Sequence, residues 1–187
     1  MDKAFTISLS KELCLQKETC SYTDIFADIF DRYYNRIYKY MRYRVKSKQE
    51  AEDLCSQVFE RVMQKIDTYN PARGPFEIWL FSIAQNTANT YYRQQKRRIW
   101  FSLESISDLP SGQHDPEEEV VHGEEQSRLL AALSSLDERE RNIIALKFAG
   151  GLKNREIAEL MGLSDSNTGV ILYRSLHRLR EILKSEE

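Results

Sequence analysis

The sequence predicts an all-α protein of two small helical domains joined by an acidic linker. Its 187 residues include only 7 Gly and 4 Pro, and 30% of them are charged, which is typical of a soluble, mostly helical protein. Apolar residues recur three and four positions apart along much of the chain, as in amphipathic helices. Residues 1–100 carry 17 Lys and Arg against 12 Asp and Glu, and residues 127–187 carry 10 against 9. Residues 101–126 carry 8 Asp and Glu and no Lys or Arg, so an acidic segment separates two basic or neutral blocks.

The first domain is expected over residues 22–98, as three helices that share one core. From Tyr22 to Val45 apolar residues recur four apart in two adjacent rows, which predicts a helix with a wide buried face. The segment Ser47–Glu50 has the form of a capping box and opens the second helix. Residues 1–21 show no clear periodicity and are expected to form an N-terminal extension.

A third helix is expected to start at Pro75, after a loop over residues 67–74 that is marked by Asn-Pro and Gly-Pro pairs. Its end interleaves aromatic and basic residues. Aromatic rings can stack on unpaired bases, and Arg and Lys bind phosphate, so this helix end could bind nucleic acid. The alternative interpretation is that Tyr91 packs inward and that the basic residues form a solvated helix end. The residues concerned are Tyr91, Tyr92, Arg93, Lys96, Arg97, Arg98 and Trp100.

An acidic linker is expected over residues 99–123, and residues 99–114 lack helical periodicity. Asp115 and Pro116 have the form of an N-cap and first helical residue, followed by three Glu that suit the positive end of a helix dipole. These Glu are more typical of a helix start than of a catalytic acid–base pair.

The second domain is expected over residues 124–187 and ends in a helix-turn-helix over 154–180. Gly162 stands where a helix ends in a left-handed residue, and Ser164 can cap the following helix. An ordinary helical hairpin packed in a core is the alternative. The apolar residues expected to face inward are Ile143, Ile144, Leu146 and Phe148 before this motif, and Val170, Leu172, Leu176, Leu179 and Leu183 within its second helix.

No catalytic, metal or cofactor site is expected. The three His, at positions 114, 122 and 177, have no metal-ligand spacing with Cys or carboxylates, and the phosphate-binding glycine motifs are absent. Cys14, Cys20 and Cys55 form no CxxC pair and are expected to be reduced thiols. Residues 1–10 lack the pattern of a secretory signal, and no run of apolar residues is long enough to cross a membrane, so a cytoplasmic location is expected.

Three segments occur in order along the chain: AEDLCSQVF at residues 51–59, PFEIWLFSIAQNTANTYYRQQKRR at residues 75–98 and LDERERNII at residues 136–144. Together they resemble the extracytoplasmic-function (ECF) sigma factors of bacterial RNA polymerase, in the sigma-70 family. Residues 51–59 (AEDLCSQVF) are similar to the family's "AEDL-Q--F" segment. Residues 75–98 (PFEIWLFSIAQNTANTYYRQQKRR) are similar to its "F--WL--IA-N---D--R---RR" segment, and residues 136–144 (LDERERNII) to the "L----R-V-" start of its last domain. The helix-turn-helix completes a resemblance that runs from about residue 22 to residue 184.

The resemblance implies a dissociable, non-enzymatic promoter-specificity subunit, with sigma region 2 over residues 22–98 and region 4 over 124–187. Its implied partners are core RNA polymerase, promoter DNA and an anti-sigma factor, with no small-molecule substrate and no cofactor. The acidic linker would lie in polymerase channels that hold RNA, or serve only as a solubilising tether. The implied polymerase contacts are Asp53, Leu54, Gln57 and Arg61. The implied −10 contacts are the loop Thr68–Gly74 with Arg73, and Asn86, Asn89, Tyr92, Arg93, Lys96 and Arg97. The implied −35 contacts are Ser166, Asn167, Thr168, Val170, Tyr173, Arg174 and Arg178.

The recognition helix departs from the family pattern, because Gly169 and Ile171 stand where many members carry Lys or Arg. Base readout would then rest on Asn167 and Thr168, with Arg174 and Arg178 on phosphates. Thr90 also stands where the family has Asp. Two other classes of protein remain as alternatives. A helix-turn-helix regulator that does not bind polymerase would leave the first domain without a function. A DNA-processing nuclease would need clustered carboxylates or metal ligands, which the sequence lacks.

Overall fold

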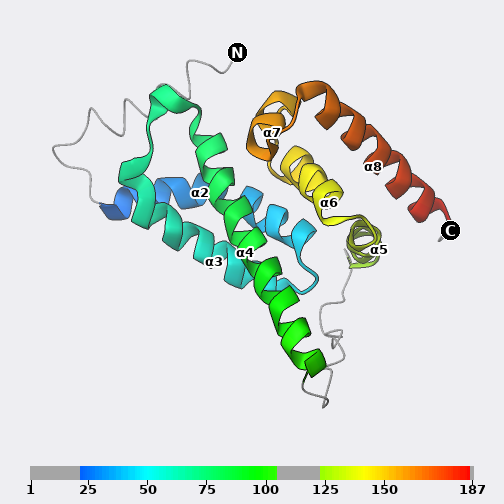
Figure 1. The fold of residues 1–187 in the computed structure, drawn as a ribbon. Coiled ribbons are helices and arrows are strands. Elements are labelled where there is room, and N and C mark those ends of the chain that lie inside the picture. Colours follow the sequence, from blue (N-terminus) through cyan, green and yellow to red (C-terminus); the bar gives the residue numbers. More distant parts are fainter. Residues whose placement is uncertain (1–21, 105–122, 186–187) are drawn as a thin grey trace.

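Seven α-helices and no strand make up the part of the chain that the computed structural model describes, residues 22–104 and 123–185 (Figure 1). The all-α prediction is therefore confirmed. The expected extension over residues 1–21 and the expected helix start at Asp115 lie outside the described residues. The α-helices are α2 (Tyr22–Arg44), α3 (Lys48–Lys65), α4 (Phe76–Glu104), α5 (Gly123–Ser134), α6 (Glu138–Ile144), α7 (Asn154–Met161) and α8 (Asp165–Ser185). Shorter turns are η1 (Ile66–Thr68), η2 (Pro71–Arg73) and the π-helical η3 (Ala145–Ala149).

Helices α2, α3 and α4 share the core of the first half. The capping box at the start of α3 is formed as predicted: Glu50 N donates to Ser47 Oγ at 3.1 Å, and Ser47 N donates to Glu50 Oε2 at 3.4 Å. Helix α4 continues to Glu104, beyond the boundary expected at residue 98. Among the described residues, no helix is both long and apolar enough to cross a bilayer. The core side chains include Ile29, Ile37, Met41, Leu54, Val58, Phe59, Leu80 and Ala84.

The second half contains the predicted helix-turn-helix, α7 and α8. Gly162 ends α7 in the left-handed region, with φ of 63°, and Asn167 N donates to Ser164 Oγ at 3.2 Å at the start of α8. Both local predictions at this corner are confirmed, because they depend only on groups that lie within one turn of each helix end.

The prediction that Phe148 faces inward is wrong, because its side chain is 56% exposed. It lies in η3, where Gly150 N donates to Ala145 O, an i→i+5 bond of 2.9 Å. Such a π-turn holds more residues per turn than an α-helix and changes the direction of the side chains that follow. Ile143, Ile144 and Leu146 are buried as expected.

The buried face of α8 also differs from the prediction. Val170 and Leu176, which were expected to face inward, are 43% and 39% exposed. Thr168 and Ser175 are buried in their place, together with Leu172 and Leu179. Thr168 Oγ1 donates to Ser164 O at 3.1 Å, and Ser175 Oγ donates to Ile171 O at 2.8 Å. Each hydroxyl is therefore satisfied by the carbonyl one turn earlier, which allows a polar residue on the buried face.

The two halves pack directly against each other, and their buried apolar residues form one continuous core. Helix α2 lies along α6 and η3, as Figure 1 shows. At this contact Tyr40 Oη donates to Asn142 Oδ1 at 2.7 Å, and Arg36 Nη2 donates to Gly150 O. Gly150 has no room for a side chain, because an added Cβ would lie 2.5 Å from Leu146 O and 3.1 Å from Phe81 Cε1.

Candidate nucleic-acid interface

A polar and basic face runs along the second half of α4. Its exposed side chains are three or four positions apart, so they lie on one side of the helix. Tyr92 is half-buried beside them, its hydroxyl donating to the carbonyl of Arg44 and its ring lying 5.1 Å from the Arg44 guanidinium. The exposed side chains of this α4 face are Asn86, Asn89, Arg93, Lys96 and Arg97.

The expected loop before α4 is built from η1 and η2. Asn70 Oδ1 accepts from Ala72 N at 2.9 Å, and Tyr69 Oη donates to Gly74 O at 3.2 Å. Gly74 has a φ of 151°, a conformation that L side chains rarely adopt. Arg73 is exposed on this loop. Because it precedes α4, it lies about six helical turns from Lys96, and the structure does not bring the two together.

A pocket of about 450 Å³ lies where the α4 face meets the start of α6. It gathers most of the residues predicted to bind the −10 element, and adds one acidic residue that was not predicted. Its lining consists of Asn89, Tyr92, Arg93, Lys96, Arg97 and Glu138.

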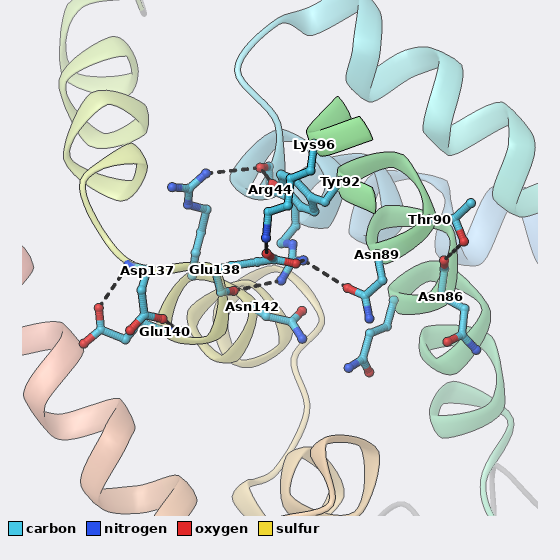
Figure 2. A network of polar contacts seen from close by, with 12 residues as sticks. Arg44, Asn86, Asn89, Thr90, Tyr92, Lys96, Asp137, Glu138, Glu140 and Asn142 are labelled. Carbon is cyan, nitrogen blue, oxygen red and sulfur yellow. Dashed lines mark hydrogen bonds and ion pairs between the residues drawn. The ribbon is translucent and has the colours of Figure 1, made fainter. Parts of the chain in front are cut away.

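Arg44 lies behind this pocket and links the two halves. Its side chain is only 1% exposed, yet it makes polar contacts with both α4 and α6. Arg44 Nη2 donates to Asn89 Oδ1 at 3.3 Å and lies 3.8 Å from Glu138 Oε1, and Arg44 Nη1 donates to Glu138 O at 3.2 Å. Lys96 Nζ lies 3.2 Å from Glu138 Oε2. Figure 2 shows Arg44, Lys96 and Glu138 converging, with Asn89 and Tyr92 beside them.

The outer face of α8 carries most of the residues predicted to bind the −35 element. Tyr173 is 72% exposed at its centre. Arg178 Nη1 lies 3.4 Å from Glu140 Oε2 of α6, so this predicted phosphate contact is held by an intramolecular ion pair. The other exposed members are Ser166, Asn167, Val170 and Arg174.

Thr168 does not belong to that face. Its side chain is fully buried and its hydroxyl donates to Ser164 O, so it presents no atom to a base in this structure. Leu54 is buried in the first core in the same way and offers no surface to polymerase, whereas Asp53 and Gln57 are exposed on α3. Arg61 is half-buried, and its Nη1 donates to Thr87 Oγ1 at 2.9 Å.

The sequence-based prediction did not pair Arg44 with Glu138, because nothing in the local pattern links positions 94 residues apart. The described residues contain no group of three or more His, Cys, Asp or Glu that could hold a metal ion. Burial raises the pKa of the Cys55 thiol to about 12, as expected of a core residue and not of a reactive thiol.

Comparison with known proteins identifies the family. The family model for Sigma-70 region 2 matches residues 29–98, and that for Sigma-70, region 4, matches residues 126–179. The ECF RNA polymerase sigma factor SigX of Bacillus subtilis is 30% identical over 170 residues, 87% of this chain and 87% of SigX. The chain belongs to the ECF sigma factors. Its function is therefore that of a sigma subunit, which directs RNA polymerase to promoters.

Other relatives agree with this assignment. The ECF sigma factor BldN of Streptomyces coelicolor is 28% identical over 163 residues, and the sigma factor described here spans 87% of its own length but only 62% of BldN. Two solved structures share the fold. The sigma factor RpoE from Bartonella quintana, in complex with the anti-sigma factor NepR, superposes with a TM-score of 0.69 at 20% identity, covering 87% of this chain and 98% of RpoE. CnrH, in complex with the cytosolic domain of CnrY, superposes with a TM-score of 0.64 at 21% identity, covering 87% and 89%.

Proposed function

We propose that this sigma factor holds promoter DNA at two points, with the α4 face and its preceding loop on the −10 element and with α8 on the −35 element. The observation that carries the proposal is the α4 face, where two Asn and three cationic side chains are exposed on one side of a helix. Amides can bond to base edges, and Arg and Lys bind phosphates, so one face supplies both kinds of contact.

At the −10 element, Tyr92 and the loop over residues 68–74 would receive unpaired bases. A flipped base needs a shaped pocket and an aromatic or apolar surface on which to stack. Tyr92 lies in the pocket lined by Asn89 and Arg93, and Tyr69 stiffens the loop by packing its ring 5.2 Å from Phe76.

At the −35 element, the outer face of α8 would enter the major groove. Asn167 lies in the first turn of α8 and is exposed, as a base-reading residue must be. Val170 and Tyr173 give this face an apolar centre suited to the methyl group of thymine. Arg174 and Arg178 would bind phosphates on either side, and Arg178 must exchange Glu140 for DNA to do so.

On α3, the exposed Asp53 and Gln57 would contact core RNA polymerase, with the half-buried Arg61 one turn after Gln57. An anti-sigma factor is a further partner that we propose, because RpoE is solved in complex with the anti-sigma factor NepR, and CnrH in complex with the cytosolic domain of CnrY. The sigma factor would act in the cytoplasm, as a binding subunit without a catalytic site, a cofactor or a small-molecule substrate.

The deciding experiment is reconstitution with core RNA polymerase. Purified sigma factor should co-elute with core polymerase in gel filtration and should support initiation at promoters found by sequencing the 5′ ends of transcripts after its overproduction. Two double variants separate the DNA-binding surface from the polymerase-binding surface. The double variant Asn89→Ala, Arg93→Ala should abolish initiation but still co-elute with core polymerase. The double variant Asp53→Ala, Gln57→Ala should co-elute with core polymerase more weakly. A chain that never co-elutes with core polymerase would instead be a free-standing helix-turn-helix regulator.

A further inference from the structure

The carboxylate of Glu138 lies between two cations that belong to the other half of the molecule. One oxygen is 3.2 Å from Lys96 Nζ, and the other is 3.8 Å from Arg44 Nη2. Arg93 and Arg97 line the same pocket, in which Glu138 is the one acidic lining residue. Two cationic side chains of the first half therefore pair with a single carboxylate supplied by α6, and two more line the same pocket.

This arrangement of cations suits a phosphate group as well as a carboxylate. Both are oxyanions, and both are bound by Arg and Lys through charge-assisted hydrogen bonds. Asn89, beside them, accepts a bond from Arg44 through Oδ1, which orients its amide along the same pocket. The carboxylate of Glu138 thus occupies the position in which the α4 face would hold a phosphate of a DNA strand.

We infer that Arg44 and Lys96 form a backbone-phosphate subsite for promoter DNA, and that Glu138 fills this subsite when the two halves are packed together. The packed arrangement is then a self-inhibited state, in which Glu138 of region 4 occupies one phosphate position beside the exposed −10 face of α4. The inference rests on the proposed function of the α4 face, and it adds two residues, Arg44 and Glu138, that this function did not include.

The charged part of this contact stabilises the packed arrangement only weakly. Arg44 is a buried cation whose Nε has no hydrogen-bond partner, and Arg141 Nε, at the same contact, has none either. Arg141 otherwise reaches across to the carbonyl of Arg44 at 3.4 Å. Buried charges that are incompletely bonded stabilise an interface weakly, because desolvation offsets much of their attraction.

The first test measures DNA binding by the full chain without polymerase. The probe is a short fluorescein-labelled single-stranded oligonucleotide of mixed sequence, followed by fluorescence anisotropy. Glu138→Gln removes the competing charge and should raise affinity roughly three- to tenfold at low ionic strength. Glu159→Gln on α7 changes the same charge at an exposed position outside the pocket and should leave affinity unchanged. Circular dichroism and melting temperature confirm that each variant is folded.

The results separate this inference from the proposed function. If Lys96→Gln and Asn89→Ala weaken binding while Glu138→Gln binds as the unaltered chain does, the α4 face stands and self-inhibition is overturned. If none of the α4 variants weakens binding, the −10 assignment fails, and the inference fails with it. If Glu138→Gln and Glu159→Gln raise the affinity for the oligonucleotide equally, the effect arises from net charge alone. That result would also overturn the inference.

The second test follows the separation of the halves directly. A donor and an acceptor dye are attached at two exposed positions, through Gln64→Cys of α3 and Glu181→Cys of α8. Energy transfer between the dyes then reports the distance between the two halves. Cys14 and Cys20 are replaced by Ser in this chain, so that the dyes do not react there. Oligonucleotide binding should lower the transfer, and Glu138→Gln should lower it at smaller oligonucleotide concentrations. Binding without any change in transfer would show that DNA and the packed arrangement coexist, contrary to the inference.

Discussion

Tyr40 and Asn142, 102 positions apart in the chain, are joined by a hydrogen bond of 2.7 Å between Tyr40 Oη and Asn142 Oδ1. Both side chains are buried where α2 meets α6, so neither can exchange this partner for water while the halves stay packed. Asn142 Nδ2 also donates to Met161 Sδ at 2.9 Å, which extends the contact to α7. This chain of contacts joins the two sigma regions through polar atoms inside an otherwise apolar core.

Tyr40→Phe should destabilise the packed arrangement, because it leaves Asn142 Oδ1 buried without a donor. An unsatisfied buried acceptor costs about 1–3 kcal/mol. Urea unfolding monitored by circular dichroism measures this loss. Tyr173→Phe removes the same hydroxyl from an exposed side chain and should leave the midpoint unchanged. Equal midpoints for the two variants would show that the Tyr40 bond contributes nothing.

Alkaline pH should weaken the same contact. Burial raises the pKa of Tyr40 from 10.0 to about 12, so the folded chain retains this proton more strongly than the unfolded chain does. The contribution of the Tyr40 proton to the free energy of unfolding is fully present below pH 10 and is lost as the pH rises through about 12. The urea midpoint should fall across this window, and the fall should be smaller in Tyr40→Phe. A fall of the same size in both chains would assign it to other tyrosines, such as Tyr33, whose pKa is also raised by burial.

Gly169→Ala should stabilise α8. Gly169 lies in the helix, and an added Cβ would meet only Asn154 Nδ2, at an ordinary contact distance of 3.9 Å. The change should add up to about 1 kcal/mol through helix propensity. The melting temperature measures the gain, and DNA affinity measured alongside it shows whether Gly169 serves close approach to DNA. Lower stability would mean that the Cβ is not accommodated.

Two substitutions on α8 should have different effects on −35 recognition. Asn167→Ala should relax the base preference by about 1–3 kcal/mol, because an amide that bonds to a base edge is lost. Arg178→Ala should weaken binding to all sequences alike. The loss should be smaller than for removal of an unpaired cation, because Arg178 is paired with Glu140. Competition binding with single-base variants of the promoter measures both. The reverse pattern would exchange the base and phosphate assignments.

Val170 should sense thymine methyl groups. Replacing each thymine of the −35 element in turn by uracil removes only the methyl group, and should cost about 1 kcal/mol at the base that Val170 contacts. In Val170→Ala the same replacement should cost less. If uracil has no effect in the unaltered chain, the exposed apolar centre of α8 does not read methyl groups.

Much of the local structure could be predicted because it depends on neighbouring residues. The capping box at Ser47 and the corner at Gly162 and Ser164 are set within one turn of each helix end. The exposed α4 face could also be predicted from the spacing of its polar residues. Val170 and Leu176 could not be placed, because an apolar pattern does not show that the hydroxyls of Thr168 and Ser175 are satisfied within their own helix.

The sequence by itself determined the all-α class, the positions of most helix ends and the order of motifs that marks an ECF sigma factor. All of these depend on interactions between residues a few positions apart, or on the order of short segments. Only the tertiary structure decided which side of α8 is buried, that η3 turns Phe148 outward, and that Glu138 reaches Arg44. The physical reason is that such contacts arise from the packing of two cores against each other, and the free energy of that packing depends on residues about a hundred positions apart in the chain.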